Sequence, residues 1–159
     1  MLCSADSGTG RVVSCFFSMF LHFGAPHLIN NILVLFVLGQ RLEPAVGKLK
    51  FLLIYIAGGL GGNLISLFWD MHTGDYSVSA GASGAVFALM GGMIYVIMRH
   101  RGRVADLTIR QMLIMAAFSL YFGFASEGVD NAAHAGGLVC GFLTAVIVYH
   151  PRKIWKIVP

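Results

Sequence analysis

The hydrophobic residues of this chain are gathered in five long runs that short polar stretches separate. The runs lie at about residues 28–42, 51–69, 80–98, 109–126 and 132–150. Apolar residues are continuous within a run and do not alternate with polar ones, which is typical of helices and not of barrel strands. Most runs approach the roughly 20 residues that a helix needs to cross a bilayer. The pattern therefore predicts five transmembrane helices.

The composition agrees with a membrane protein. Hydrophobic residues make up 57% of the 159 residues and charged residues only 11%, so the chain is far more apolar than an ordinary soluble domain. We expect an all-α, polytopic membrane helix bundle with no separate soluble domain. Its parts are an extracytoplasmic or interfacial loop segment over residues 1–27, a transmembrane domain over residues 28–150, and a basic tail over residues 151–159.

The charged residues predict an orientation in the membrane. Nearly all of the eleven Lys and Arg residues fall in residues 41–50, 99–110 and 152–156, while the other connections between the predicted helices carry acidic residues and no Lys or Arg. The positive-inside rule places the basic connections and the C-terminus in the cytoplasm. The net charge of +4 is then a topology signal, and we expect no nucleic-acid partner.

The three cysteines show no spacing that is typical of a metal site. Their odd number favours unpaired residues over a disulfide framework for Cys3, Cys15 and Cys140. We expect neither a metal ion nor another cofactor.

Three of the predicted helices begin with polar residues at the same depth in the membrane. The helices that begin near His27, Ser83 and His134 all run from the outside inward, so their first turns lie at the same outer level. Asn31 follows His27 by four residues and therefore shares its helical face. Polar groups at membrane depth are costly unless they pair or line a watery cavity, which makes these four residues a candidate functional site.

These residue types favour acyl transfer, most simply peptide hydrolysis. Histidine is the usual base that accepts a serine proton near neutral pH, so Ser83 and His134 form a candidate nucleophile and base. Asp130 lies one turn before His134 and is predicted to face the outer aqueous boundary, which favours a dyad over a triad. The Ser83 backbone N–H, the Asn31 amide and His27 are candidate donors to an oxyanion.

Three motifs resemble those of the rhomboid family of intramembrane serine proteases. They are H-x-x-x-N at residues 27–31, G-x-S-G at residues 81–84 and A-H-x-x-G-x-x-x-G at residues 133–141, within a likeness that covers about residues 16–150. The resemblance implies Ser83 as nucleophile, His134 as base, and His27 and Asn31 beside the oxyanion. It also implies that the substrates are transmembrane segments cut near the extracytoplasmic face. We expect a multi-pass protein of the bacterial plasma membrane whose active site opens to that side.

Further residues have supporting roles by the same resemblance. His22 would order the loop before the first visible helix, and Phe87 stands where the family often has a tyrosine that packs on the catalytic histidine. Phenylalanine can stack there but cannot donate a hydrogen bond. Gly81 and Gly84, which flank Ser83 in the second motif, are supporting residues as well. Small residues let helices pack closely, and we expect this of Gly137 and Gly141.

The N-terminus departs from the family pattern. The family core has six helices and commonly carries a Trp-Arg or Tyr-Arg pair where this chain reads Val13-Ser14. Five visible helices lead us to expect a truncated chain that lacks the first helix of the core. The alternative is an inactive relative that binds membrane clients without cleaving them, although such a protein would usually lose Ser83 or His134. A transporter is less favoured, because no charge lies in the middle of a predicted span and no internal repeat is found.

Overall fold

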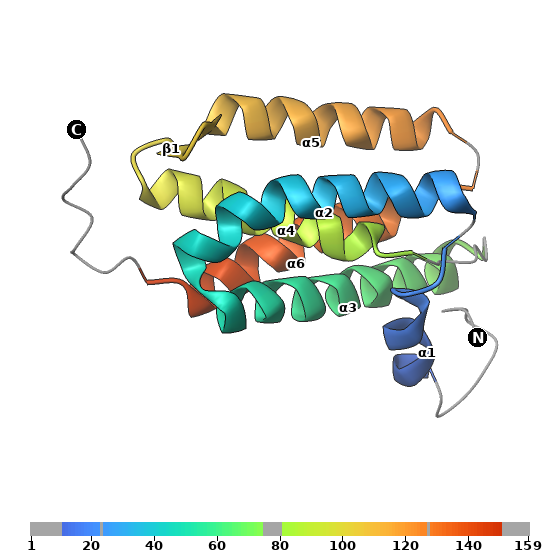
Figure 1. The fold of residues 1–159 in the computed structure, drawn as a ribbon. Helices are drawn as coiled ribbons and strands as arrows, with labels where there is room; N and C mark the ends of the chain where they lie inside the picture. Colours follow the sequence, from blue (N-terminus) through green and yellow to red (C-terminus); the bar gives the residue numbers. More distant parts are fainter. Residues whose placement is uncertain (1–10, 23, 75–80, 127, 151–159) are drawn as a thin grey trace.

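The computed structural model describes residues 11–22, 24–74, 81–126 and 128–150. These residues form six helices and a two-stranded hairpin (Figure 1). The elements are α1 (Arg11–Ser18), α2 (Ala25–Val46), α3 (Lys48–Thr73), α4 (Ser83–Arg99), β1 (Arg103–Val104), β2 (Leu107–Thr108), α5 (Ile109–Phe124) and α6 (Asn131–Val148). The prediction of an all-α bundle with five long helices is confirmed. The short helix α1 lies in the segment for which the sequence predicted a loop.

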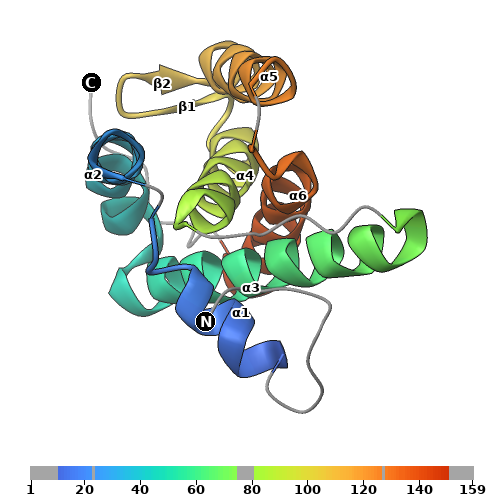
Figure 2. The ribbon, with the colours of Figure 1, turned by 90° about the vertical axis from the view of Figure 1, so that its right-hand side faces the viewer.

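Helix α4 occupies the centre of the bundle. It packs against α2, α3, α5 and α6, and the view along the bundle shows it enclosed by these helices (Figure 2). Buried residues follow one another from Gly84 to Ile94 with no exposed face. A helix that is apolar all round belongs in an interior, so the stretch that begins at Ser83 forms the core of the protein.

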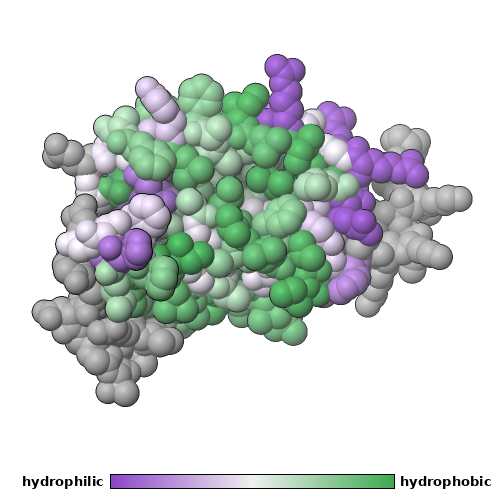
Figure 3. All heavy atoms as spheres, turned by 180° about the vertical axis from the view of Figure 1, so that it is seen from behind, coloured by the Kyte–Doolittle hydropathy of each residue, from purple (hydrophilic) through white to green (hydrophobic). Residues whose placement is uncertain are grey.

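The outer surface of the bundle is apolar. Large hydrophobic side chains of the outer helices are exposed, such as Phe68 at 74%, Phe124 at 76% and Ile147 at 73%. The face opposite to that of Figure 1 is largely hydrophobic across its middle, with hydrophilic residues toward the two ends (Figure 3). A continuous apolar surface of this kind is typical of a lipid-facing protein.

Two of the described helices, α3 and α6, have both the length and the apolar composition that a membrane crossing requires. Helices α4 and α5 are apolar but shorter, with 17 and 16 residues. The five membrane spans expected from the sequence therefore stay a prediction, whereas the five long helices are observed.

Local sequence explains where the helices begin and end. Pro26 stands in the first turn of α2, where its missing N–H is not needed. Gly47 separates α2 from α3 with a φ of +90°, and its N–H donates to the Glu43 carbonyl, so the chain reverses within one residue. Thr108 and Gln111 form a capping box at the start of α5.

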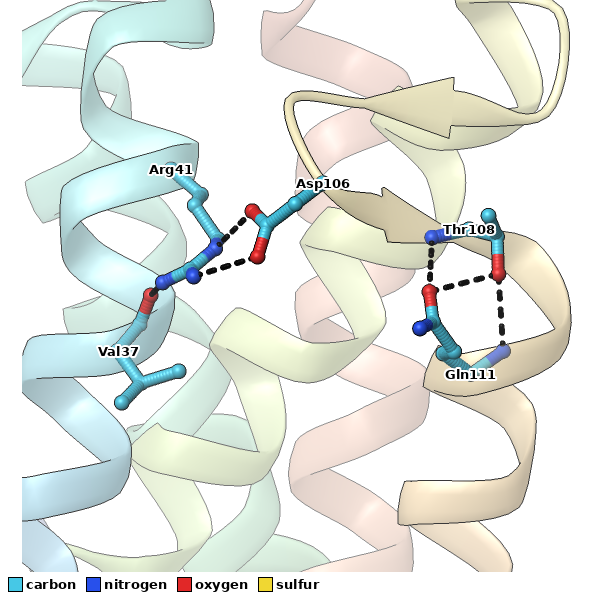
Figure 4. A network of polar contacts seen from close by, with 5 residues as sticks. All are labelled: Val37, Arg41, Asp106, Thr108 and Gln111. Atoms are coloured by element: carbon cyan, nitrogen blue, oxygen red, sulfur yellow. Dashed lines mark hydrogen bonds and ion pairs between the residues drawn. The ribbon is translucent and has the colours of Figure 1, made fainter.

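An ion pair joins α2 to the hairpin that precedes α5. The Arg41 guanidinium donates to both carboxylate oxygens of Asp106 at 2.6 and 2.7 Å, and it also donates to the Val37 carbonyl (Figure 4). The hydrogen bond from Arg41 lowers the pKa of Asp106 to about 2. Since Asp106 lies between β1 and β2, this pair fastens the connection between α4 and α5 to α2.

Glycines bring α3, α4 and α6 into direct backbone contact. A Cβ atom on Gly137 would lie 2.2 Å from the Gly84 carbonyl oxygen, and one on Gly141 would lie 2.0 Å from that of Ala88. A Cβ on Gly58 would meet the Ala88 side chain at 2.3 Å. Only glycine fits at these contacts, and the helix that carries His134 lies as near to α4 as the sequence led us to expect.

The interpretation of the cysteines as unpaired residues is wrong for Cys15, while Cys3 lies outside the described residues. Cys15 is disulfide-bonded, and it is fully buried at 0% exposure. Counting cysteines could not show this, because an odd total says only that at least one residue is left over.

Candidate active site

Ser83 is the first residue of α4 and follows a tight turn at Gly81. Gly81 has a φ of +130°, and a Cβ there would lie 2.7 Å from Cε1 of His27. The Gly81 N–H donates to the Ser18 carbonyl at 2.8 Å. The turn therefore has no room for a side chain at Gly81, and it places Ser83 beside the first turn of α2.

His134 lies one turn into α6 and is 9% exposed. Its ring stacks on that of Phe87 in α4, with centroids 4.4 Å apart and planes 16° from parallel. Its Nδ1 is buried and has no hydrogen-bond partner among the described residues. The imidazole is thus oriented by packing on α4, the helix that carries Ser83.

Helix α2 contributes two polar side chains from consecutive turns. Asn31 is 5% exposed, and its Nδ2 donates to no group in the described part of the chain. The His27 ring lies edge to face against that of His22 at 5.4 Å, and His22 Nε2 is likewise buried without a partner there. Unpaired buried donors are costly, so the Asn31 amide is available to a ligand.

One pocket brings these side chains together. It has a volume of about 530 Å³ and is lined by residues of α2, α4, α5 and α6, among them His27, Asn31, Ser83 and His134. No hydrogen bond joins Ser83 to His134 in the described structure, and such bonds are often long or poorly aligned in unliganded sites. The same residues contain no group of three or more His, Cys, Asp or Glu that could hold a metal ion.

Two features of the site were missed from the sequence. Helix α5 contributes Met115, Phe118 and Phe122 to the lining of the pocket. Apolar residues that line a pocket look the same in sequence as residues that face lipid. Asp130 was expected to face the outer aqueous boundary. It is instead half-buried at the pocket, where its carboxylate caps α6 and accepts a hydrogen bond from Ser66.

An apolar helix bundle with a serine, a histidine and an unpaired amide at one internal pocket defines a candidate serine hydrolase site. The family model for the Rhomboid domain matches residues 9–151. The chain therefore belongs to the rhomboid family, as the motifs suggested, and is an integral membrane protein.

Curated relatives show the same family membership. The chain is 36% identical to rhomboid protease GluP of Bacillus subtilis (strain 168) over 83% of its length. It is 36% identical to RHOMBOID-like protein 4 of Arabidopsis thaliana over 91%, and 35% identical to rhomboid protease AarA of Providencia stuartii over 86%. The matches span 25%, 36% and 56% of these relatives, so the relatives are considerably longer.

Proposed function

We propose that this chain is an intramembrane serine endopeptidase that hydrolyses peptide bonds of transmembrane segments with a Ser83–His134 dyad. One observation carries the proposal: Ser83, His134, His27 and Asn31, from three helices, line a single pocket. Two relatives bear the name rhomboid protease, which supports the same chemistry. No cofactor takes part in the proposed reaction.

The reaction begins when Ser83 Oγ attacks the carbonyl carbon of the substrate peptide bond and its proton passes to the His134 imidazole. The resulting oxyanion accepts hydrogen bonds from the Ser83 backbone N–H, the Asn31 amide and His27. His134 then donates the proton to the leaving amine, which breaks the C–N bond and leaves an acyl-enzyme. Water, deprotonated by His134, hydrolyses the ester and restores Ser83.

Helix lengths support a site below the outer membrane surface. At about 1.5 Å per residue, the 26 residues of α3 span about 39 Å and the 17 residues of α4 about 26 Å. Helix α3 extends past the start of α4 (Figure 1), and Ser83 is the first residue of α4, which supports a site below the outer end of the bundle. With the basic connections in the cytoplasm, this end faces the extracytoplasmic side, and the C-terminus is cytoplasmic.

The proposed function predicts a covalent adduct on Ser83. Detergent-solubilised protein treated with a serine-reactive fluorophosphonate should carry one phosphonyl group, which mass spectrometry of its peptides assigns to Ser83. Ser119 lines the same pocket from α5 but is not expected to react, because no histidine is proposed as its base. Absence of an adduct in folded protein would favour the alternative, a relative that binds membrane clients without cleaving them.

Asn31→Ala should slow cleavage of a model transmembrane substrate without abolishing it. Removing one oxyanion donor typically lowers kcat by about 100- to 1000-fold, and the Asn31 amide lies buried and unpaired at the pocket. Gln40→Ala, which removes an exposed amide from the same helix, is the control. A wild-type kcat in folded Asn31→Ala protein would remove this residue from the oxyanion site.

The proposed orientation predicts which side of the membrane each end of the bundle faces. A cysteine in place of His72, exposed at the end of α3, should react with an impermeant thiol reagent outside intact cells. One in place of Arg103, exposed in the hairpin, should react only after permeabilisation. The parent chain, labelled in parallel, measures reaction at the native cysteines. The opposite pattern would place the site on the cytoplasmic side.

A further inference from the structure

A side-chain hydrogen bond joins α3 to the start of α6. The Ser66 hydroxyl donates to Oδ2 of Asp130 at 2.5 Å. Ser66 is 1% exposed, so its hydroxyl is removed from competing water and Asp130 is its hydrogen-bond partner. A hydrogen bond to a carboxylate is stronger than one between neutral groups. The pair therefore fastens the N-terminus of α6 to the neighbouring helix.

Asp130 also holds the turn that contains His134. Its Oδ1 accepts a hydrogen bond from the Ala133 N–H at 2.8 Å, and its backbone carbonyl accepts one from the His134 N–H at 3.2 Å. Both carboxylate oxygens are thus engaged, one with α3 and one with the first turn of α6. A shift of Asp130 would move the backbone of His134 with it.

The same face of α3 touches this turn one helical turn earlier. A Cβ on Gly62 would lie 2.6 Å from the Ala133 carbonyl oxygen and 2.9 Å from the Gly137 nitrogen. Gly62 and Ser66 are four residues apart and therefore share a face. Gly62 sets how closely α6 can approach, and the Ser66–Asp130 bond sets its rotation and height against α3.

We propose that Ser66 and Asp130 are positioning residues that hold His134 in register with Ser83 for proton transfer. The inference rests on the proposed protease activity. Asp130 is not a third member of a triad, because His134 Nδ1 has no hydrogen-bond partner among the described residues. It acts through the backbone of α6, while Phe87 sets the plane of the ring.

Loss of this bond should lower the rate of the chemical step and leave substrate binding nearly unchanged. Asp130 lines the pocket but Ser66 does not, so Ser66→Ala breaks the bond without removing a residue that would contact a substrate. A displacement of about 1 Å in a catalytic group can cost roughly 100-fold in rate. We therefore expect Ser66→Ala to lower kcat by about 10- to 100-fold with little change in KM.

The decisive experiment compares Ser66→Ala, Asp130→Ala and Asp130→Asn in the full chain, reconstituted with a model transmembrane substrate. Asparagine is as good an N-cap as aspartate and can still exchange a hydrogen bond with Ser66, so Asp130→Asn should retain clearly more kcat than Asp130→Ala. The double variant Ser66→Ala/Asp130→Ala should be no slower than Asp130→Ala, because the two residues form one interaction. Thr144→Ala is the matched control, since that hydroxyl donates to the Cys140 carbonyl of its own helix.

Rates of fluorophosphonate labelling and thermal melts accompany each kinetic measurement. Slower cleavage and slower labelling in variants that are folded at the assay temperature, with partial rescue by asparagine, support the proposal. If Asp130→Ala does not fold, the cleavage and labelling rates of Ser66→Ala and Asp130→Asn test the proposal instead. Melting points that fall while kcat and labelling stay at wild-type values, or a change confined to KM, would overturn it. If wild-type protein itself neither labels nor cleaves, the proposed function fails and the positioning role fails with it.

Discussion

Replacing Ser83 with alanine is expected to abolish cleavage of a model transmembrane substrate, with a loss of roughly a million-fold in kcat. Alanine cannot form the acyl bond, so only the slow attack of water within the site is left. His134→Ala should cost nearly as much, because the proposed acceptor of the serine proton is then missing. Since nucleophile and base act as a unit, the double variant should be no slower than either single one. Initial rates of product formation in proteoliposomes measure all three.

The structure makes these variants suitable for a clean comparison. Ser83 is a small side chain at the first position of α4, where alanine fits without strain. His134→Ala removes the ring that stacks on Phe87, so its thermal melt must be recorded beside its rate. Turnover above a hundredth of wild type in either folded variant would contradict the dyad.

Much of this site could be predicted because its signals are local. Hydropathy locates a long helix from the residues of that helix alone, and charge in the connections predicts its orientation. Alternate helices of such a bundle run in the same direction. The helices that begin near His27, Ser83 and His134 must therefore have their N-termini at the same end. The pocket that contains all three is consistent with that reasoning.

The contacts between distant residues could not be predicted in this way. Ser66 and Asp130 are 64 positions apart, as Arg41 and Asp106 are 65 apart, and each pair depends on the rotation of a helix about its own axis. Hydropathy is nearly uniform around these helices, so it carries little information on rotation. Asp130 was consequently assigned to the aqueous boundary from its position alone.

The pairs of small residues, in contrast, do indicate which face of a helix packs against a neighbour. A Gly-x-x-x-Gly spacing repeats on one helical face and reports a close approach without naming the partner helix. The structure supplies the partners, which are Gly84 for Gly137 and Ala88 for Gly141. These two glycines thus allow α6, the helix that carries His134, to pack closely against α4, the helix that carries Ser83.

Gly137→Leu is accordingly expected to destabilise the fold more than any other substitution considered above. The Cβ atom alone would lie 2.2 Å from the Gly84 carbonyl oxygen and 3.0 Å from the carbonyl carbon, and a backbone cannot rotate away as a side chain can. Overpacking of this kind costs about 3 kcal/mol or more, which lowers the melting temperature of a chain of this size by roughly 6–12 °C. Thermal unfolding in detergent, followed by circular dichroism, measures the shift.

Ala135→Leu provides the matched control for this substitution. It adds a leucine side chain to the same turn of α6, but Ala135 is exposed on the outer face of the helix, where an apolar residue meets lipid or detergent. Its melting temperature should stay within a few degrees of wild type. Gly137→Leu should also lose probe labelling at Ser83 below its melting temperature, because α6 must move away from α4 to admit the side chain. A melt and a labelling rate that both match Ala135→Leu would show that the two helices do not need their close contact at Gly137.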